Sequence, residues 1–397
     1  MDFLAAKVNE AADHLLGEKV EAVGKALHQP IQLTQVDWNE YWRAVLNVGI
    51  YRRGADVAEV GSTWLESLVG MDVLTEFTPQ DLRKLGRQDD FFPSVWHSVT
   101  AEKDGRVWAI PFRADVRLIF YWKDLFEQGG VDPEQAFTSL ETIAPALRQM
   151  KNRGVTTPWG APTAKGDRDL VYSLASWLWA AGGEFIAPAT HKVELSSPAS
   201  YRGLRAYFGL TEFMPDEGQF YTDTELLELF GQRKVAAIIG GPWVPAYLRD
   251  HHFSDLHLGA VLPPGPSFVG GTALVTWQHS KTPREAKELV GQLSEANFQK
   301  VYSQLAGCLP VRSTSWNAEF LATDPLLPVY LKALETGRGL PPIRLWGMIE
   351  DRLAETLGAI WAEIFATSRT RRETELEAIL TRQIEPLVTR LEMIMNG

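Results

Sequence analysis

The sequence predicts an α/β protein with two domains. Short apolar segments that end in Gly or Pro alternate with longer segments of helical periodicity, which is typical of sheets covered by helices on both faces. The length of 397 residues is too great for one simple core and suits two domains of ordinary size. A hydrophobic content of 45% and a charged content of 22% indicate a folded, globular chain.

Each predicted element depends on local periodicity and on turn residues. Apolar side chains recur at helical spacing from residue 3 to residue 27, so a single helix is expected there. Alternating or continuous apolar runs bounded by Gly and Pro predict strands, and apolar stripes that begin at Ser, Thr or Asp and end at Gly predict helices. The predicted strands are 31–36, 55–60, 98–103, 106–110, 116–122, 235–239, 258–262 and 273–277. The further predicted helices are 39–50, 63–69, 139–151, 169–181, 198–213, 224–232, 282–293, 295–305 and most of 343–395.

Charge and cysteine content exclude several classes of protein. Lys and Arg total 39 against 50 Asp and Glu, and a net charge of −11 disfavours binding to a nucleic-acid backbone. The single cysteine, Cys308, cannot form an internal disulfide and is expected to be a structural thiol. The group Asp250-His251-His252, even with Asp255 and His257, does not match a compact zinc spacing. We therefore expect neither a metal nor a cofactor.

The first residues and the apolar segments bear on the cell compartment. The N-terminal sequence MDFLAAKVNE lacks the apolar stretch of a signal peptide, and no run of 18 apolar residues suggests a membrane span. By itself, this pattern leads us to expect a protein without an export signal.

Four loops at strand ends predict a ligand site. They read Gly61-Ser62-Thr63-Trp64, Pro111-Phe112-Arg113-Ala114-Asp115-Val116-Arg117, Gly240-Gly241-Pro242-Trp243 and Gly270-Gly271-Thr272. Ligands of open α/β sheets bind at strand ends, and glycine allows a backbone to approach another surface closely. Indole rings stack well on the flat faces of sugars, and the chain has 14 Trp. The loops therefore predict a cleft for a polar, flat-faced small molecule.

These segments resemble the family 1 extracellular solute-binding proteins of sugar ABC transporters, a group that includes maltose- and trehalose-binding proteins. The resemblance lies in residues 55–64, in 105–111 continuing to 121–126, in 236–243 and in Gly307-Cys308-Leu309-Pro310-Val311-Arg312, in this order along the chain. It implies a two-lobed periplasmic-binding-protein-like (type II) fold with the ligand in a cleft between the lobes.

The resemblance also implies how the chain is divided. Lobe 1 would comprise residues 1–112 and 261–315, lobe 2 would comprise residues 113–260 and 316–397, and the hinges would lie near 111–113, 261–266 and 312–316. One departure from the family is expected. The family begins with a buried strand, whereas only a helix is predicted before Ile31 in this chain.

Eight site residues follow from the resemblance. Thr63 and Trp64 would offer a polar group and an aromatic ring from the first lobe, Asp115 would accept sugar hydroxyls, and Trp243 would form a stacking platform. Gly271 would bring backbone to the ligand, and Arg312 and Trp346 lie in segments that reach the cleft. Tyr172, in the predicted helix before Gly182-Gly183, matches the family pattern less closely. The alternatives are core packing for Trp64 and Trp243 and a structural ion pair between Asp115 and the flanking Arg113 or Arg117.

The function implied is non-catalytic binding of a sugar, in particular a di- or oligosaccharide, by a monomer that delivers it to an ABC transporter permease. By the resemblance, the protein would be periplasmic or otherwise outside the cytoplasm. A cytoplasmic sensory or regulatory sugar-binding domain is the alternative that the missing export signal supports. A glycan-active enzyme is a third reading, but no pair of carboxylates can be assigned to glycoside hydrolysis from the sequence.

Overall fold

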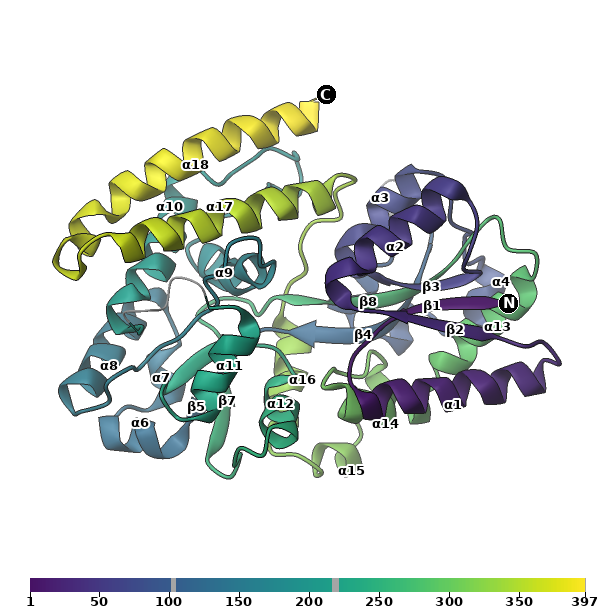
Figure 1. The fold of residues 1–397 in the computed structure, drawn as a ribbon, viewed down its shortest axis with the longest axis horizontal. Coiled ribbons are helices and arrows are strands. Elements are labelled where there is room, and N and C mark those ends of the chain that lie inside the picture. Colours follow the sequence, from purple (N-terminus) through teal and green to yellow (C-terminus); the bar gives the residue numbers. More distant parts are fainter. Residues whose placement is uncertain (101–104, 216–220, 397) are drawn as a thin grey trace. The chain divides into compact units, whose positions relative to one another are not determined.

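The computed structural model describes residues 1–100, 105–215 and 221–396, which form two compact α/β units (Figure 1). Unit 1 comprises Met1–Val116, Val269–Glu335 and Pro342–Trp346, and unit 2 comprises Arg117–Phe268, Thr336–Pro341 and Gly347–Gly397. The α/β fold class expected from the sequence is confirmed.

Four segments lie in a different unit from the one expected, and one of them is Pro342–Trp346, which belongs to unit 1. Residues 113–116 belong to unit 1 because strand β4 (Ile110–Val116) pairs with β8 (Val269–Thr276) along its length. Residues 261–268 belong to unit 2, where the Arg117 N–H donates to the Phe268 carbonyl. Residues 316–335 belong to unit 1, where the Ser94 hydroxyl donates to the Leu334 carbonyl.

The sheet of unit 1 has the strand order β2-β1-β3-β8-β4. The strands not yet defined are β1 (Asp2–Ala6), β2 (Gln32–Val36) and β3 (Val57–Gly61). Strand β1 is parallel to β2 and β3, and β8 is antiparallel to β3 and β4. The helices are α1 (Glu10–Ala26), α2 (Trp38–Tyr51), α3 (Leu65–Gly70), α4 (Pro79–Leu85), α5 (Pro93–His97), α13 (Pro283–Leu293), α14 (Ala296–Ala306), α15 (Ala318–Leu321) and α16 (Leu327–Thr336). In Figure 1, α1 and α14 lie on one face of the sheet and α2 and α3 on the other.

Strand β1 corrects the expectation that only a helix precedes residue 31. Phe3, Leu4, Ala5 and Ala6 are all buried, as in a parallel strand covered on both faces. A continuous apolar run of this length has no period that separates a strand from a helix, and Leu and Ala favour helices, so the sequence pattern was misleading. The Asn9 side chain accepts from the Ala12 N–H and begins α1. The first strand that the resemblance implies is therefore present, in the interior of the sheet.

Unit 2 has a smaller antiparallel sheet with the order β6-β5-β7, formed by β5 (Leu118–Trp122), β6 (Ala237–Gly240) and β7 (Leu258–Val261). Its helices are α6 (Lys123–Gly129), α7 (Pro133–Ala136), α8 (Leu140–Asn152), α9 (Asp169–Ala180), α10 (Pro198–Phe208), α11 (Asp223–Gly231), α12 (Val244–Asp250), α17 (Trp346–Ala366) and α18 (Arg372–Asn396). Helices α17 and α18 lie side by side in Figure 1, and Glu363 pairs with Arg382 between them.

Two remaining expectations concern a hairpin and membrane spans. The hairpin predicted over residues 98–110 reduces, in the described part, to one antiparallel bridge between Thr100 and Val107, and residues 101–104 of its turn lie outside the described residues. Among the described helices, none combines the length and the apolar character that crossing a membrane requires.

Candidate functional site

In unit 1, Trp64 lies in the interior. It ends the one-turn 3-10 helix η1 (Ser62–Trp64), which follows β3, and only 1% of the residue is exposed. The ring packs on Trp42, with centroids 4.9 Å apart, and a Cβ added to Gly61 would lie 3.0 Å from the Trp64 Cδ2. In this structure, core packing describes Trp64 better than ligand stacking, and Thr63 beside it is half-buried.

A second indole, which the sequence analysis did not select, covers Trp64. Trp38 is the first residue of α2, directly after the carboxyl end of β2 and the N-cap residue Asp37. It is 43% exposed and stacks on Trp64. Its position after a strand end, beside a polar N-cap, was the signal that could have identified it.

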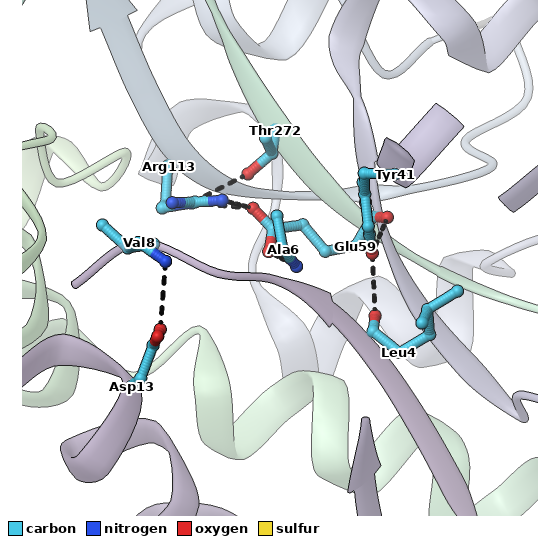
Figure 2. Close-up of polar contacts among 8 residues, drawn as sticks. All are labelled: Leu4, Ala6, Val8, Asp13, Tyr41, Glu59, Arg113 and Thr272. Carbon is cyan, nitrogen blue, oxygen red and sulfur yellow. Dashed lines mark hydrogen bonds and ion pairs between the residues drawn. The ribbon is translucent and has the colours of Figure 1, made fainter. Parts of the chain in front are cut away.

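A buried ion pair ties together the strands of unit 1 (Figure 2). The Arg113 Nε donates to Glu59 Oε1 at 2.7 Å, and the Glu59 side chain is fully buried. Glu59 Oε2 accepts from the Ala6 N–H at 3.2 Å, and Arg113 Nε also lies 3.3 Å from the Thr272 hydroxyl. The network thus connects β1, β3, β4 and β8 at one place in the sheet.

Burial and ion pairing shift the pKa of Arg113 in opposite directions. Burial by itself lowers the pKa of Arg113, but the facing Glu59 carboxylate more than offsets this and raises the net pKa above its ordinary value. The Tyr41 hydroxyl donates to the main-chain carbonyls of Leu4 and Glu59, at 2.9 and 2.6 Å. Burial raises the pKa of this phenol, which therefore stays protonated as a donor.

Gly271 has a structural explanation in strand β8. Its φ is +131°, a conformation that L side chains rarely adopt, and an added Cβ would lie 2.0 Å from the Arg113 carbonyl oxygen. The pairing of β4 with β8 shifts register between Pro111 and Arg113 at the same place. Glycine at this position therefore accommodates a bulge in β4, and such bulges re-aim side chains.

The other predicted residues of unit 1 differ in how far they are available to a ligand. The half-buried Arg312 donates through Nε to the Ser294 carbonyl and through Nη2 to the Leu85 carbonyl, and its guanidinium lies 4.9 Å from the centroid of Phe91. These contacts commit the Nε and Nη2 donors to unit 1. Trp346, at the start of α17, is 1% exposed and therefore also lies in the interior. Asp115 is half-buried in β4, opposite Gly270.

In unit 2, an aromatic cluster surrounds one buried cation. The Arg117 guanidinium carbon lies 4.6 Å from the centroid of Trp243, 5.1 Å from that of Tyr172 and 5.7 Å from that of Phe268. Tyr172 and Phe268 stack on each other with centroids 4.5 Å apart. Arg117 also pairs with Asp169 at 2.5 Å. The structure thus brings the two predicted residues of unit 2, Tyr172 and Trp243, to the same group.

Trp243 is held by a hydrogen bond at its edge. Its Nε1 donates to Asp223 Oδ2 at 2.8 Å, and the residue is half-buried. The ring follows Gly240-Gly241-Pro242 at the end of β6, and Asp223 is the first residue of α11. The indole is therefore fixed in orientation at a strand end, the position that the sequence predicts for a stacking platform.

Three carboxylates accompany Arg117 and Trp243. Burial and, after it, the charge of Asp169 raise the pKa of Asp223 to about 8, and the same two causes raise the pKa of Asp167 to about 6. Asp167 Oδ1 accepts from the Asp169 N–H at 2.9 Å. One guanidinium is thus shared by several carboxyl groups, and part of the cluster carries a proton near neutral pH.

Tyr172 is tied to the last part of the chain. Its hydroxyl donates to Glu350 Oε1 at 2.7 Å, and Arg168 Nε lies 3.6 Å from the other oxygen of Glu350. Burial and the Glu350 charge raise the pKa of Tyr172 above its ordinary value. The contact connects α9 with α17 within unit 2. Among the described residues, no group of His, Cys, Asp and Glu side chains has the arrangement of a metal site.

Similar proteins support a solute-binding fold. The chain is 23% identical over 322 residues to a protein of Brucella abortus (strain 2308) described as a binding protein, and the match covers 77% of this chain and 74% of the relative. The fold matches the sugar-binding protein MalE from Xanthomonas citri with a TM-score of 0.80 and 19% identity, over 100% of both chains. It matches maltose-bound MalE3 of T. maritima with a TM-score of 0.77 and 17% identity, over 96% of this chain and 99% of that one.

A third structure binds a different compound. UgpB from Mycobacterium tuberculosis, solved in complex with glycerophosphocholine, matches with a TM-score of 0.73 and 20% identity, over 96% of this chain and 98% of that one. The sequence profile of the bacterial extracellular solute-binding proteins matches residues 20–329, which is well over half of the chain. The protein belongs to the bacterial extracellular solute-binding protein family.

Proposed function

We propose that the protein binds a sugar, in particular a di- or oligosaccharide, outside the cytoplasm and delivers it unaltered to an ABC transporter permease. Membership of the solute-binding family supports this role, and two of the structurally similar proteins described above are a sugar-binding protein and a maltose-bound protein. The alternative of a cytoplasmic sensory domain has no comparable support.

The observation that carries the proposal is the fixed indole of Trp243. A ring held at its N–H loses little further freedom when a sugar face stacks on it, so more of the contact energy appears as affinity. The neighbouring Asp169, the ion-pair partner of Arg117, offers an acceptor for sugar hydroxyls, and hydrogen bonds to charged groups are strong. In unit 1, the exposed ring of Trp38 offers a second apolar face.

We assign unequal weight to the eight predicted residues. Trp243, Asp115 and Thr63 remain proposed ligand contacts, and Trp38 joins them. Trp64, Trp346, Arg312, Gly271 and Tyr172 are proposed as supports. Trp64 and Trp346 are buried, and the hydrogen bonds of Arg312 and Tyr172 and the close approach at Gly271 are to the backbone or to a neighbouring helix of their own unit.

Capture would involve movement of the units about the segments that connect them. The chain passes between the units after Val116, Phe268, Glu335, Pro341 and Trp346. Short connections of this kind absorb the backbone rotations of a hinge. Small-angle X-ray scattering with and without saturating maltose tests this point. A decrease in the radius of gyration on binding supports closure, and an unchanged value with sugar bound contradicts it.

A thermal-shift screen tests the ligand class. The probes are glucose, maltose, maltotriose and glycerophosphocholine, and a ligand present at 100 times its Kd should stabilise the fold by about 2.7 kcal/mol. We expect maltose or maltotriose to raise the melting temperature more than glucose. Stabilisation by glycerophosphocholine alone, or by none of the four, would contradict the proposal.

Two further parts of the proposal have their own measurements. Chromatography of maltotriose after prolonged incubation should recover the trisaccharide intact, since we propose no catalysis, and product release would establish an enzyme. Sedimentation should give a single species of about the chain mass of 44.4 kDa, because we propose a monomer.

A further inference from the structure

Two arginines flank the first passage of the chain between the units, and each is buried in a different unit. Arg113 lies in β4 of unit 1, where it pairs with Glu59. Arg117 lies at the first residue of unit 2, where it pairs with Asp169. Only Ala114, Asp115 and Val116 separate them. We call the two ion pairs the unit 1 anchor (Glu59–Arg113) and the unit 2 anchor (Asp169–Arg117).

The unit 1 anchor holds both strands that lead to the passage. Arg113 is on β4, and the Thr272 hydroxyl that lies 3.3 Å from its Nε is on β8. Ala114 is fixed further, because its N–H donates to the Leu309 carbonyl and its carbonyl accepts from the Leu309 N–H, both at 2.9 Å. Glu59 also accepts from the Ala6 N–H, which extends the anchor to β1 (Figure 2).

The unit 2 anchor holds the continuation of the same two strands. The Arg117 N–H donates to the Phe268 carbonyl at 3.1 Å, and the Ser267 hydroxyl donates to the Arg117 carbonyl at 2.6 Å. The Arg117 side chain is 2% exposed and lies against the rings of Phe268 and Tyr172. The backbone is therefore fixed again at residues 117 and 268.

Between the two anchors, strands β4 and β8 remain paired over a few residues. Asp115 is opposite Gly270 and Val116 is opposite Val269, and Gly271 follows with its φ of +131°. We propose that Arg113 and Arg117 are positioning residues that confine hinge bending at this passage to Asp115–Val116 and the facing residues Val269–Gly271. Hinges use a few residues that absorb large φ and ψ changes, and glycine does so at low steric cost.

Each buried ion pair opposes sliding of the strand that carries its arginine. A guanidinium that leaves its buried carboxylate strands two charges in the interior, which is strongly destabilising. The two strands therefore cannot slip within either unit while the units move. The inference rests on the proposed function only in assuming that the units move relative to each other.

The test measures that movement directly, without a sugar. Spin labels on Arg43→Cys in unit 1 and Arg249→Cys in unit 2, both exposed positions, report the distribution of distances between the units. Cys308 can stay, because burial raises its pKa to about 11 and suppresses its reactivity. As a check, the chain without the two added cysteines is treated with the same spin label and should take up none.

The variants distinguish the effect of losing an anchor from the effect of losing any other ion pair. Glu59→Gln/Arg113→Met removes both charges and leaves none unpaired. Asp81→Asn/Lys287→Met is the matched control, since Asp81 on α4 and Lys287 on α13 form a partly buried pair in unit 1 outside β4 and β8. The corresponding variant of the unit 2 anchor is Asp169→Asn/Arg117→Met, which also removes the cation beside Asp167 and Asp223.

We expect each anchor variant to widen the distance distribution at least twofold and the control to leave it unchanged. Equal widths in all folded variants would overturn the inference. If circular dichroism shows that a double variant is unfolded, Arg113→Lys decides, because it keeps the charge but loses the bonds of the guanidinium, and it should widen the distribution measurably. A chain that binds no sugar would refute the proposed function and leave this comparison valid.

Discussion

Trp38 lies nearly parallel to Trp64, with 5.0 Å between the ring centroids and 21° between the ring planes. The two indoles differ in exposure, at 43% for Trp38 and 1% for Trp64. The inner ring supports the outer one, which keeps a large part of its surface exposed. We therefore expect Trp64 to contribute to stability and Trp38 to contribute to binding.

Alanine substitutions should therefore have opposite effects at the two positions. Trp64→Ala should lower the free energy of unfolding by about 3–5 kcal/mol, as expected for a large buried ring. Trp38→Ala should change stability little and weaken maltose binding at least about tenfold, or about 1.4 kcal/mol. Urea denaturation and calorimetry measure the two effects. Tyr51→Ala, at the exposed far end of α2, is the control, and equal loss of binding there would remove Trp38 from the site.

Substitutions of Trp243 distinguish stacking from the hydrogen bond at its edge. Trp243→Ala should abolish detectable maltose binding, because both the ring and its orienting contact are lost. Trp243→Phe keeps an aromatic face but leaves Asp223 without the indole donor, so binding should weaken only partly. Calorimetry with the two variants measures the difference. A large drop in melting temperature with binding preserved would show that Trp243 is a core residue.

The raised pKa of Asp223 predicts a pH dependence of stability. Its pKa is about 8 in the folded chain, against 3.8 for an ordinary Asp, so the folded state binds more protons than the unfolded state between these values. Stability should therefore fall as the pH rises from about 4 to about 8, by on the order of 1 kcal/mol for this half-buried group after solvent screening.

Asp223→Asn provides the comparison for this effect. The variant removes the titrating group. As the pH rises from 5 to 8.5, the native chain should therefore lose unfolding free energy relative to the variant. Urea titrations at several pH values measure it. A difference that is constant with pH would contradict the assignment of the proton to Asp223.

Arg312 should matter for stability and not for binding. Arg312→Ala leaves the carbonyls of Ser294 and Leu85 without their donor and uncovers Phe91, which should cost about 1–3 kcal/mol. Maltose affinity of the folded variant should stay unchanged in calorimetry. The exposed Arg83→Ala on α4 is the control for loss of one positive charge. Reduced affinity in Arg312→Ala alone would return this residue to the ligand site.

Much of the fold could be read from the sequence because its signals are local. The alternation of strands and helices, the buried strand before Gly61 and the loop before Trp243 each depend on neighbouring residues, and all are present in the structure. The family resemblance was recognised from four short segments, and the family assignment is confirmed. The first strand was missed because Phe3 to Ala6 form an apolar run without a distinguishing period.

The sequence by itself determined the α/β class and the strand-end loops through periodicity and turn residues, and it determined the family through the resemblance carried by four short segments. The tertiary structure alone decided which of two neighbouring indoles is exposed, which carbonyls take the donors of Arg312, and that Arg113 meets a carboxylate 54 positions away. Such outcomes depend on burial and on contacts between distant segments. The sequence pattern shows which side chains are able to form these contacts. Only the packing of the folded chain selects the partner of each one and decides which side chains stay exposed to water.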